Sequence, residues 1–409
     1  MKKTTALIFT FALSLLGSQK SWAADLCFPE GESRFSGSIA PEIRLFESSA
    51  GQAEQHDGEI PSVAFDFTYE YQSNDGKQTI ELNPFYRYDA NDSDREHADL
   101  RTGYWMYEGD NWDVRVGVDR VFWGVTESNH LVDVINQTDL VESFDGEEKL
   151  GQPMVKLSTY QSWGTLRAFV LPGFRERTYP GPNGRLRGPL PVAVDSAQYE
   201  AGAKRRHIDT ALRYENVFGD FDVGIAHFSG TSREPAFTTG IAADGSLVFV
   251  PTYNLMDQTS IDVQLTTEST LYKLEALTRE TQGVRFEAYS AGLEYTFYSL
   301  FNTDMDLGLL LEYHYDNRPT SGLPTTFLDH DIFFGTRFTF NDVDDKQFLA
   351  GIIIDRYTKN RTFSIEYSQR IGANYKLEIE GILFAGAADS YAQALGRDDS
   401  LMLRLTRYF

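Results

Sequence analysis

Apolar and polar side chains alternate along most of this chain, in blocks of about ten residues. Residues 61–72 show the pattern clearly. One side carries Val63, Phe65, Phe67, Tyr69 and Tyr71, and the other carries Asp66, Thr68 and Glu70. Because successive side chains of a strand point to opposite faces of a sheet, each such block predicts a strand with one apolar and one polar face.

The next two blocks continue the alternation after a turn signal, Asp75-Gly76, which favours a hairpin. In residues 77–89 the apolar set is Ile80, Leu82, Tyr86 and Tyr88, and the polar set is Glu81, Asn83 and Arg87. In residues 98–107 we expect Leu100, Tyr104 and Met106 outside, and Asp99 and Arg101 inside. Two further aromatic side chains, Phe85 and Trp105, are expected to face inward as a surface for sugars.

Eighteen alternating blocks are found in total. They lie at about 33–47, 61–72, 77–89, 98–107, 112–123, 153–161, 164–172, 207–216, 219–229, 258–268, 270–280, 285–298, 304–316, 329–341, 346–357, 361–370, 374–385 and 400–409. Short connections such as 108–111, 161–164, 341–345 and 371–374 alternate with long ones such as 48–60, 124–152, 173–206, 230–257, 317–328 and 386–399. This asymmetry is typical of membrane barrels, with short periplasmic turns and long outer loops.

The sequence therefore predicts an all-β fold: a transmembrane, antiparallel, up-and-down β-barrel of about 18 strands, with 16 as the alternative. A soluble sandwich also alternates, but it rarely needs so many strands in one domain. No fixed repeat period supports a solenoid.

The long third outer loop, residues 124–152, follows the strand that begins at Trp112. It combines an apolar patch at Leu131, Val132, Val134 and Ile135 with an acidic run that includes Asp133, Asp139, Glu142, Asp145, Glu147 and Glu148. We interpret it as a constriction loop folded into the lumen, with the patch in a short helix packed on the wall. Asp133 and Asp139 then face the water column.

Charged side chains on the polar faces suggest a field across this constriction. The wall residues assigned to it are Arg87, Arg101 and Arg115, and the loop residues are Asp133, Asp139, Glu142, Asp145 and Glu147. Inward acids are at least as numerous as inward bases, so charge pairing that simply keeps the lumen solvated is the alternative.

The fourth outer loop, residues 173–206, is basic, with Arg175, Arg177, Arg185 and Arg187, and its prolines favour an extended course. It is a candidate for attracting anionic solutes or for binding lipopolysaccharide phosphates. A solvated loop beside acidic neighbours is the alternative.

The first residues and the composition indicate the cellular compartment. Lys2 and Lys3, an apolar stretch from Ala6 to Gly17 and a small-residue site at Ser21-Trp22-Ala23 predict a secretory signal peptide at 1–23, leaving a barrel at 24–409. Tyr 22 and Phe 29 are an aromatic excess that suits interfacial girdles. The single Cys forms no internal disulfide, and a net charge of −23 disfavours nucleic acid as a partner.

The final residues, Ser400 to Phe409, alternate Leu401, Leu403 and Leu405 and end on an aromatic ring. This end resembles the C-terminal insertion signal of bacterial outer-membrane proteins, which implies recognition by the barrel-assembly machinery, although Arg407 departs from the pattern. The whole chain is similar to porin-type barrels, and its strand count to the alginate-export family. Residues Arg120-Val-Phe-Trp-Gly-Val-Thr-Glu-Ser128 partly resemble a Trp-Gly-Glu-Ser motif of uncharacterised proteobacterial barrels.

We therefore expect a bacterial outer-membrane channel, in contact with lipid and lipopolysaccharide, for passive or facilitated diffusion of small hydrophilic, charged solutes or oligosaccharides. Export of an acidic polysaccharide is one alternative, and a barrel enzyme or adhesin is another. No catalytic Ser and His set is recognised. No cofactor or metal is expected beyond weak Ca²⁺ binding in the acidic loops, because the residues at His314, Asp316, His330 and Asp331 lack tight ligand spacing.

Overall fold

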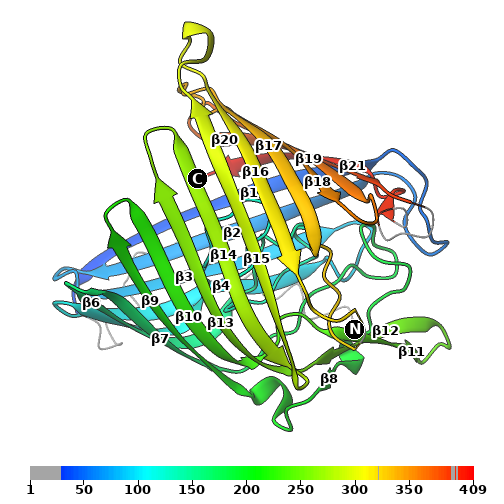
Figure 1. Cartoon of the computed structure of the whole chain (residues 1–409), viewed down its shortest axis with the longest axis horizontal. Coiled ribbons are helices and arrows are strands. Elements are labelled where there is room, and N and C mark those ends of the chain that lie inside the picture. The colour runs from blue at the N-terminus through cyan, green and yellow to red at the C-terminus, as the bar shows by residue number, and fades with distance from the viewer. Residues whose placement is uncertain (1–28, 321, 388–391, 393–394) are drawn as a thin grey trace, which may run out of the picture.

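One antiparallel sheet of 18 strands closes on itself and forms the body of the molecule. The computed structural model describes residues 29–320, 322–387, 392 and 395–409, so the predicted signal peptide lies outside the described residues. Closure is direct, because the first strand, β1 (Gly31–Phe46), pairs with both β2 (Ile60–Ser73) and the last strand, β21 (Ser400–Tyr408). Figure 1 shows the strands inclined around a single wall. The predicted barrel and its count of 18 are confirmed.

Every barrel strand corresponds to one alternating block of the sequence. The remaining strands are β3 (Gln78–Asp89), β4 (His97–Glu108), β5 (Trp112–Asp119), β6 (Gln152–Gln161), β7 (Gly164–Pro172), β9 (Ile208–Phe218), β10 (Phe221–Thr231), β13 (Leu255–Thr266), β14 (Thr270–Thr281), β15 (Val284–Phe297), β16 (Asp306–Asp316), β17 (His330–Thr339), β18 (Gln347–Asp355), β19 (Arg361–Ile371) and β20 (Tyr375–Ala385).

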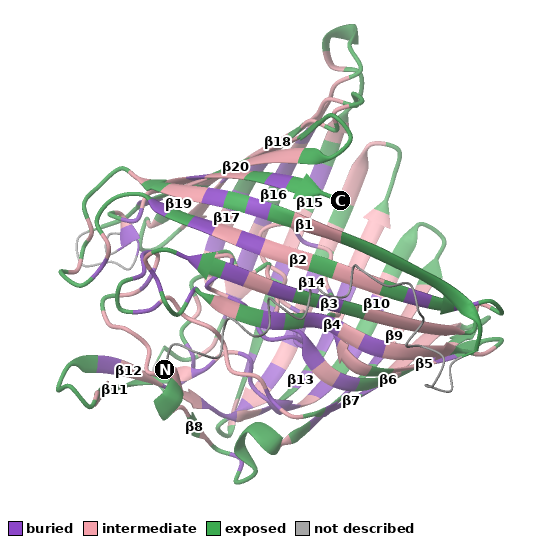
Figure 2. Cartoon of the chain, turned by 180° about the vertical axis from the view of Figure 1, so that it is seen from behind, coloured by how far each residue is buried: buried purple, intermediate pink, exposed green. Residues whose placement is uncertain are grey.

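The two faces of the wall differ as the alternation requires. Figure 2 shows buried and exposed residues alternating along the strands. The outer face exposes large apolar side chains, among them Ile39, Phe67, Leu82, Val116, Leu212, Ile225, Leu311 and Leu405, while polar side chains such as Glu42, Arg87, Glu275 and Glu312 are buried inside. Among the described residues, no helix is both long and apolar enough to cross a bilayer.

Exposed aromatic side chains gather near the short-turn end of the wall. They include Trp112, Tyr160, Trp163, Phe218, Phe221, Phe297, Tyr375 and Tyr408. Tyr and Trp prefer the boundary between hydrocarbon and water because one part of the side chain is apolar and another is polar. This ring of side chains therefore has the composition of an interfacial girdle.

The long connections lie at the opposite end, and two of them contain structure that the sequence did not predict. The fifth connection folds into a hairpin, β11 (Ala236–Ile241) with β12 (Leu247–Tyr253). A short strand of the fourth connection, β8 (Gln198–Tyr199), joins β12 in parallel and completes a separate three-stranded sheet. The fourth and fifth loops are thus bound to one another.

Strand β4 departs from the expected facing in its second half. The β3–β4 register shifts at Asn83 and Pro84, which places one extra residue in β4. Proline has no N–H for the ladder, so an irregularity at this point is physically expected. After the shift Tyr104 is buried inside and its hydroxyl donates to Glu81 at 2.6 Å. Tyr104 and Met106 therefore face the lumen, and Trp105, paired with the exposed Val116, faces outward with no access to a solute.

Strand β5 ends at Asp119, before the Trp123 that the alternation suggested. The side chain of Asn136 replaces the strand ladder there, because it accepts from the Val121 N–H at 2.8 Å and donates to the Asp119 carbonyl at 2.9 Å. The third outer connection, called loop 3 below, therefore comprises residues 120–151.

Candidate constriction site

Loop 3 lies inside the barrel, and its apolar patch is packed on the inner wall. Val132, Val134 and Ile135 are buried with Trp123 in a cluster completed by wall residues Met154, Phe169, Leu171, Ala211, Ala226, Phe228 and Met256. Leu131 packs on a second cluster that includes Leu277 and Phe286. The predicted in-folding is confirmed, but the predicted helix is wrong, since residues 131–135 form turns and irregular backbone.

Two buried wall carboxylates hold the backbone of this part of the loop. Glu275 of β14 accepts from the N–H groups of Val125, Thr126 and Val132 at 2.7, 2.9 and 3.1 Å. Glu312 of β16 accepts from the N–H groups of Glu127 and Ser128 at 2.7 and 2.9 Å. Charge-assisted bonds to several backbone donors satisfy a buried carboxylate and hold this part of the loop in its irregular course.

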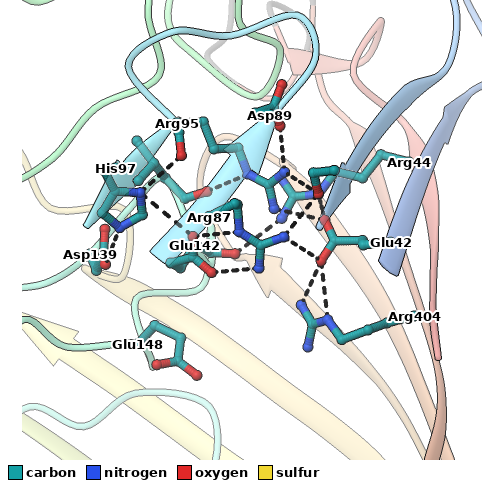
Figure 3. Close-up of polar contacts among 12 residues, drawn as sticks. Glu42, Arg44, Arg87, Asp89, Arg95, His97, Asp139, Glu142, Glu148 and Arg404 are labelled. Atoms are coloured by element: carbon teal, nitrogen blue, oxygen red, sulfur yellow. Dashed lines mark hydrogen bonds and ion pairs between the residues drawn. The ribbon is translucent and has the colours of Figure 1, made fainter. Parts of the chain in front are cut away.

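The far part of the loop is bound to other strands of the wall (Figure 3). The Arg87 guanidinium of β3 donates to both oxygens of Glu142, at 2.7 and 2.6 Å. Arg44 of β1 donates to the Glu142 carbonyl at 3.0 Å. Burial acts to raise the pKa of Glu142, but Arg87, Arg95 and His97 outweigh it and hold that pKa at about 2. Loop 3 therefore spans the lumen between β14–β16 and β1–β4.

A second buried carboxylate, Glu42 of β1, organises the arginines around this anchor. Its oxygens lie 2.7 Å from Arg95, 3.1 Å from Arg44, 2.9 Å from Arg404 and 3.3 Å from Arg87. Arg95 also binds Asp89 at 2.7 Å. Glu42, Arg95 and Arg404 were not among the predicted site residues. A lone inward-facing acid on β1 and inward-facing arginines on neighbouring strands could have indicated this group. Only the strand pairing of the closed barrel, however, shows that these side chains meet.

Two of the three predicted wall arginines reach the loop. Arg101 lies 3.3 Å from Glu148 and 3.9 Å from Glu142, and its guanidinium stacks 3.7 Å above the Phe85 ring. Arg115 instead pairs with Asp119 of its own strand at 2.7 Å, so it does not contact loop 3. His97, which was not predicted, lies 3.2 Å from Asp139.

The predicted loop acids fall into two groups. Asp133 and Asp139 do not face a water column, since both are buried: Asp133 lies 3.4 Å from Lys149, and Asp139 accepts from Thr178 of the fourth loop at 2.7 Å. Burial raises the pKa of Asp133, an effect that Lys149 only partly opposes. Asp145 and Glu147 occupy the turn 143–148 and stay partly exposed.

The predicted basic loop is not an exposed cationic cluster. Arg185 is buried and donates to Asp398 at 2.6 Å, and Arg187 is buried beside Glu54 at 2.8 Å. Arg175 pairs with Asp99 at 2.6 Å, and Arg177 donates to Gln137 at 3.3 Å. These four side chains fasten the fourth loop to the first, third and ninth outer loops and to β4, so they do not form an open cationic patch. The exposed basic residues of this loop are Lys204, Arg205 and Arg206.

Two serines and one histidine that the sequence did not group together meet between loop 3 and the wall. Ser128 and Ser290 place their hydroxyls 2.9 Å from the two ring nitrogens of His314, and Ser128 also donates to Glu312 at 2.7 Å. His314 is fully buried. The cluster therefore fastens loop 3 to β15 and β16. Among the described residues, no group of three or more His, Cys, Asp or Glu side chains is placed to hold a metal ion.

No family model and no curated protein matches this sequence. Solved structures do match its fold. OccAB1 of Acinetobacter baumannii has a TM-score of 0.55 at 9% identity, covering 95% of this chain and 99% of that one. The fold is that of a porin. A BenF-like porin from Pseudomonas fluorescens Pf-5 matches with a TM-score of 0.54 at 10% identity, covering 93% of this chain and 98% of that one. Pseudomonas aeruginosa OccK11 (OpdR) matches with a TM-score of 0.53 at 11% identity, covering 93% of this chain and 98% of that one.

Proposed function

We propose that this protein is an outer-membrane channel for the diffusion of small hydrophilic solutes. One observation carries the proposal: a loop inside a closed barrel is fixed to opposite walls. Its backbone N–H groups donate to the buried Glu275 and Glu312 on one side, and its Glu142 accepts from Arg87 and Arg44 on the other. Such a loop narrows the lumen at a fixed place. Selectivity in such a channel comes from the width and the field of the narrowing, with no chemical step.

The outer face supports membrane insertion. A belt of apolar side chains flanked by aromatic residues is unfavourable in water and stable in hydrocarbon, and a closed sheet leaves no unpaired edge there. We also propose that the barrel-assembly machinery reads the strand that ends at Phe409.

Charge inside the lumen favours small solutes over export of an acidic polysaccharide. The wall cations Arg115, Lys156, Arg213 and Arg404 are each paired with a carboxylate at 2.7–3.2 Å, so no continuous cationic track is free for a polyanion. His314 and Ser290 of the serine and histidine cluster are fully buried, which does not favour an enzyme either.

Purified protein in planar bilayers tests the channel. We expect discrete conductance steps, and silence at all voltages would contradict the proposal.

Two cysteine variants test the constriction by chemical labelling, in a background where Cys27 is replaced by Ser. Glu147 has a side chain that is 62% exposed on the loop, and Asp244 lies at the tip of the β11–β12 hairpin.

A methanethiosulfonate reagent should reduce the single-channel conductance of Glu147→Cys by roughly half, because an added group narrows the neck. The same reagent should leave Asp244→Cys unchanged. Equal responses of the two variants would place loop 3 outside the conduction path.

A further inference from the structure

Loop 3 presents one large aromatic side chain away from the wall. Val121 and Trp123 pack into the apolar cluster on the inner wall, whereas Phe122, between them, is 59% exposed. Because the loop lies inside the barrel, the side opposite the wall is the remaining lumen. A single exposed apolar side chain is ordinary on a protein surface, so the role of Phe122 depends on the charged groups beside it.

Carboxylates surround the same face of the loop. Phe144 packs edge-on against Phe384 of β20, with ring centroids 5.4 Å apart, and this contact sets the turn 143–148 beside β19 and β20. The turn carries Asp145 and Glu147, and both act electrostatically on Glu366 of β19. Glu366 and Glu380 are direct cross-strand partners, an arrangement of like charges that is destabilising by itself.

The nearby arginines do not neutralise this group. Arg337 pairs with Glu127 at 2.6 Å, and Arg404 pairs with Glu42 at 2.9 Å and reaches Glu380 only at 4.0 Å. Glu366 and Asp145 have no ion-pair partner among the described residues, and Glu147 has only His130, at 3.9 Å. His130 links the two features, since its ring packs edge-on against Phe122 with centroids 4.7 Å apart.

We propose that Phe122, Asp145 and Glu147 of loop 3, facing Glu366 and Glu380 of the wall, form a binding subsite for organic cations that carry an aromatic or other flat apolar group. The ring of Phe122 attracts a cation through its negative face and offers apolar contact area. The carboxylates supply the charge and gain a partner that the protein does not provide. This inference rests on the proposed channel.

The probes are matched in shape and opposite in charge. Benzyltrimethylammonium and benzenesulfonate both carry a phenyl ring, and tetramethylammonium carries the charge without the ring. Each is added to a single open channel in potassium chloride, and the concentration that halves the current is measured. We expect benzyltrimethylammonium to block at the lowest concentration and benzenesulfonate at the highest.

Two variants separate the contributions. Phe122→Leu keeps apolar volume and removes the ring, and it should weaken the benzyltrimethylammonium block about two- to five-fold, the effect of an exposed cation–π contact. Glu366→Gln should weaken the block by benzyltrimethylammonium and by tetramethylammonium. The block by benzenesulfonate should be unchanged or stronger in this variant. As a control, Asp244→Asn changes an acid of the outer hairpin and should alter none of these values.

The outcomes distinguish the two proposals. A protein that never conducts overturns the channel itself. A conducting channel that both phenyl ions block equally, or whose block is unaffected by Phe122→Leu and Glu366→Gln, overturns the organic-cation subsite and leaves the channel intact.

Discussion

His130 is the titratable side chain that lies between the aromatic ring and the acids of loop 3. Burial acts to lower its pKa, but Glu147, Glu275 and Asp133 outweigh this effect, so the pKa of His130 is raised above its ordinary value. Below that pKa the imidazolium neutralises Glu147, and as the pH rises through it the charge of Glu147 is released. We expect cation preference, measured as reversal potential in a salt gradient, to increase as the pH rises through the pKa of His130, which lies above its ordinary 6.5. His130→Gln should remove the contribution of His130 and so reduce that step, and an unchanged step in this variant would assign it to another group.

The alternation predicted facing at single residues wherever the register stayed regular. Arg87 and Arg101 were placed inside correctly. Arg87 lies on β3, which carries no extra residue, and Arg101 is itself the residue of β4 that has no partner at the shift. Tyr104 and Trp105 were reversed, since one extra residue in β4 exchanges the two faces of everything after it. The partners of Glu42 come from β3, β21 and the loop before β4, and no local pattern specifies which inward charges meet across a closed wall.

Loop 3, as an element, depends on the Arg87–Glu142 pair for its attachment to β3. The pKa of Glu142 is held at about 2, below its ordinary 4.5, so this attachment is complete above pH 4.5 and is lost as the pH falls toward 2. Removing one partner of a buried pair costs about 3–5 kcal/mol, because the other charge stays buried. Glu142→Gln at neutral pH should therefore release the turn 139–148, raise single-channel conductance and add current noise. Asp110→Asn, in a short periplasmic turn, is the control, and a Glu142→Gln channel with wild-type conductance would show that the anchor is dispensable.

The apolar patch was enough to predict that this loop folds inward, because four such residues are unfavourable in an outer loop in water. Its internal conformation was not predictable. The groups that bind its backbone, Glu275 and Glu312, lie about 150 and 185 residues away in the sequence, and they replace the local carbonyls on which a helix depends. The four arginines of the fourth loop were misjudged for the same reason, since Arg185 meets Asp398 only when the fourth and last outer loops come together.

At the scale of the whole molecule, the local pattern predicted the architecture well. Strands of a meander pair with their sequence neighbours, so counting alternating blocks also counts hairpins, and alternating loop lengths give the two ends of the barrel. The lipid-facing side needs no specific partner, so the outward apolar positions could be predicted one by one wherever no extra residue shifted the register. The second sheet of β8, β11 and β12 escaped prediction because it joins two loops that are distant in sequence.

The barrel closes where β1 pairs with β21, a junction called the seam here, and Phe409 extends this pairing. Phe409 and Gly37 exchange two backbone hydrogen bonds at 3.0 Å, and the Phe409 ring packs edge-on against Phe67. A Cβ on Gly37 would lie 2.9 Å from both rings, closer than carbon atoms approach without displacement. Gly37→Val should therefore weaken the seam by about 1–3 kcal/mol, through overpacking. Deleting Phe409 should reduce the yield of folded barrel more strongly, because it removes the backbone bonds as well. The fraction that migrates as compact, unheated barrel on a denaturing gel measures both effects, with Gly245→Val at the outer hairpin tip as a substitution away from the seam. If the Phe409 deletion assembles in the outer membrane as well as the intact chain, neither the seam nor recognition of the last strand depends on this residue.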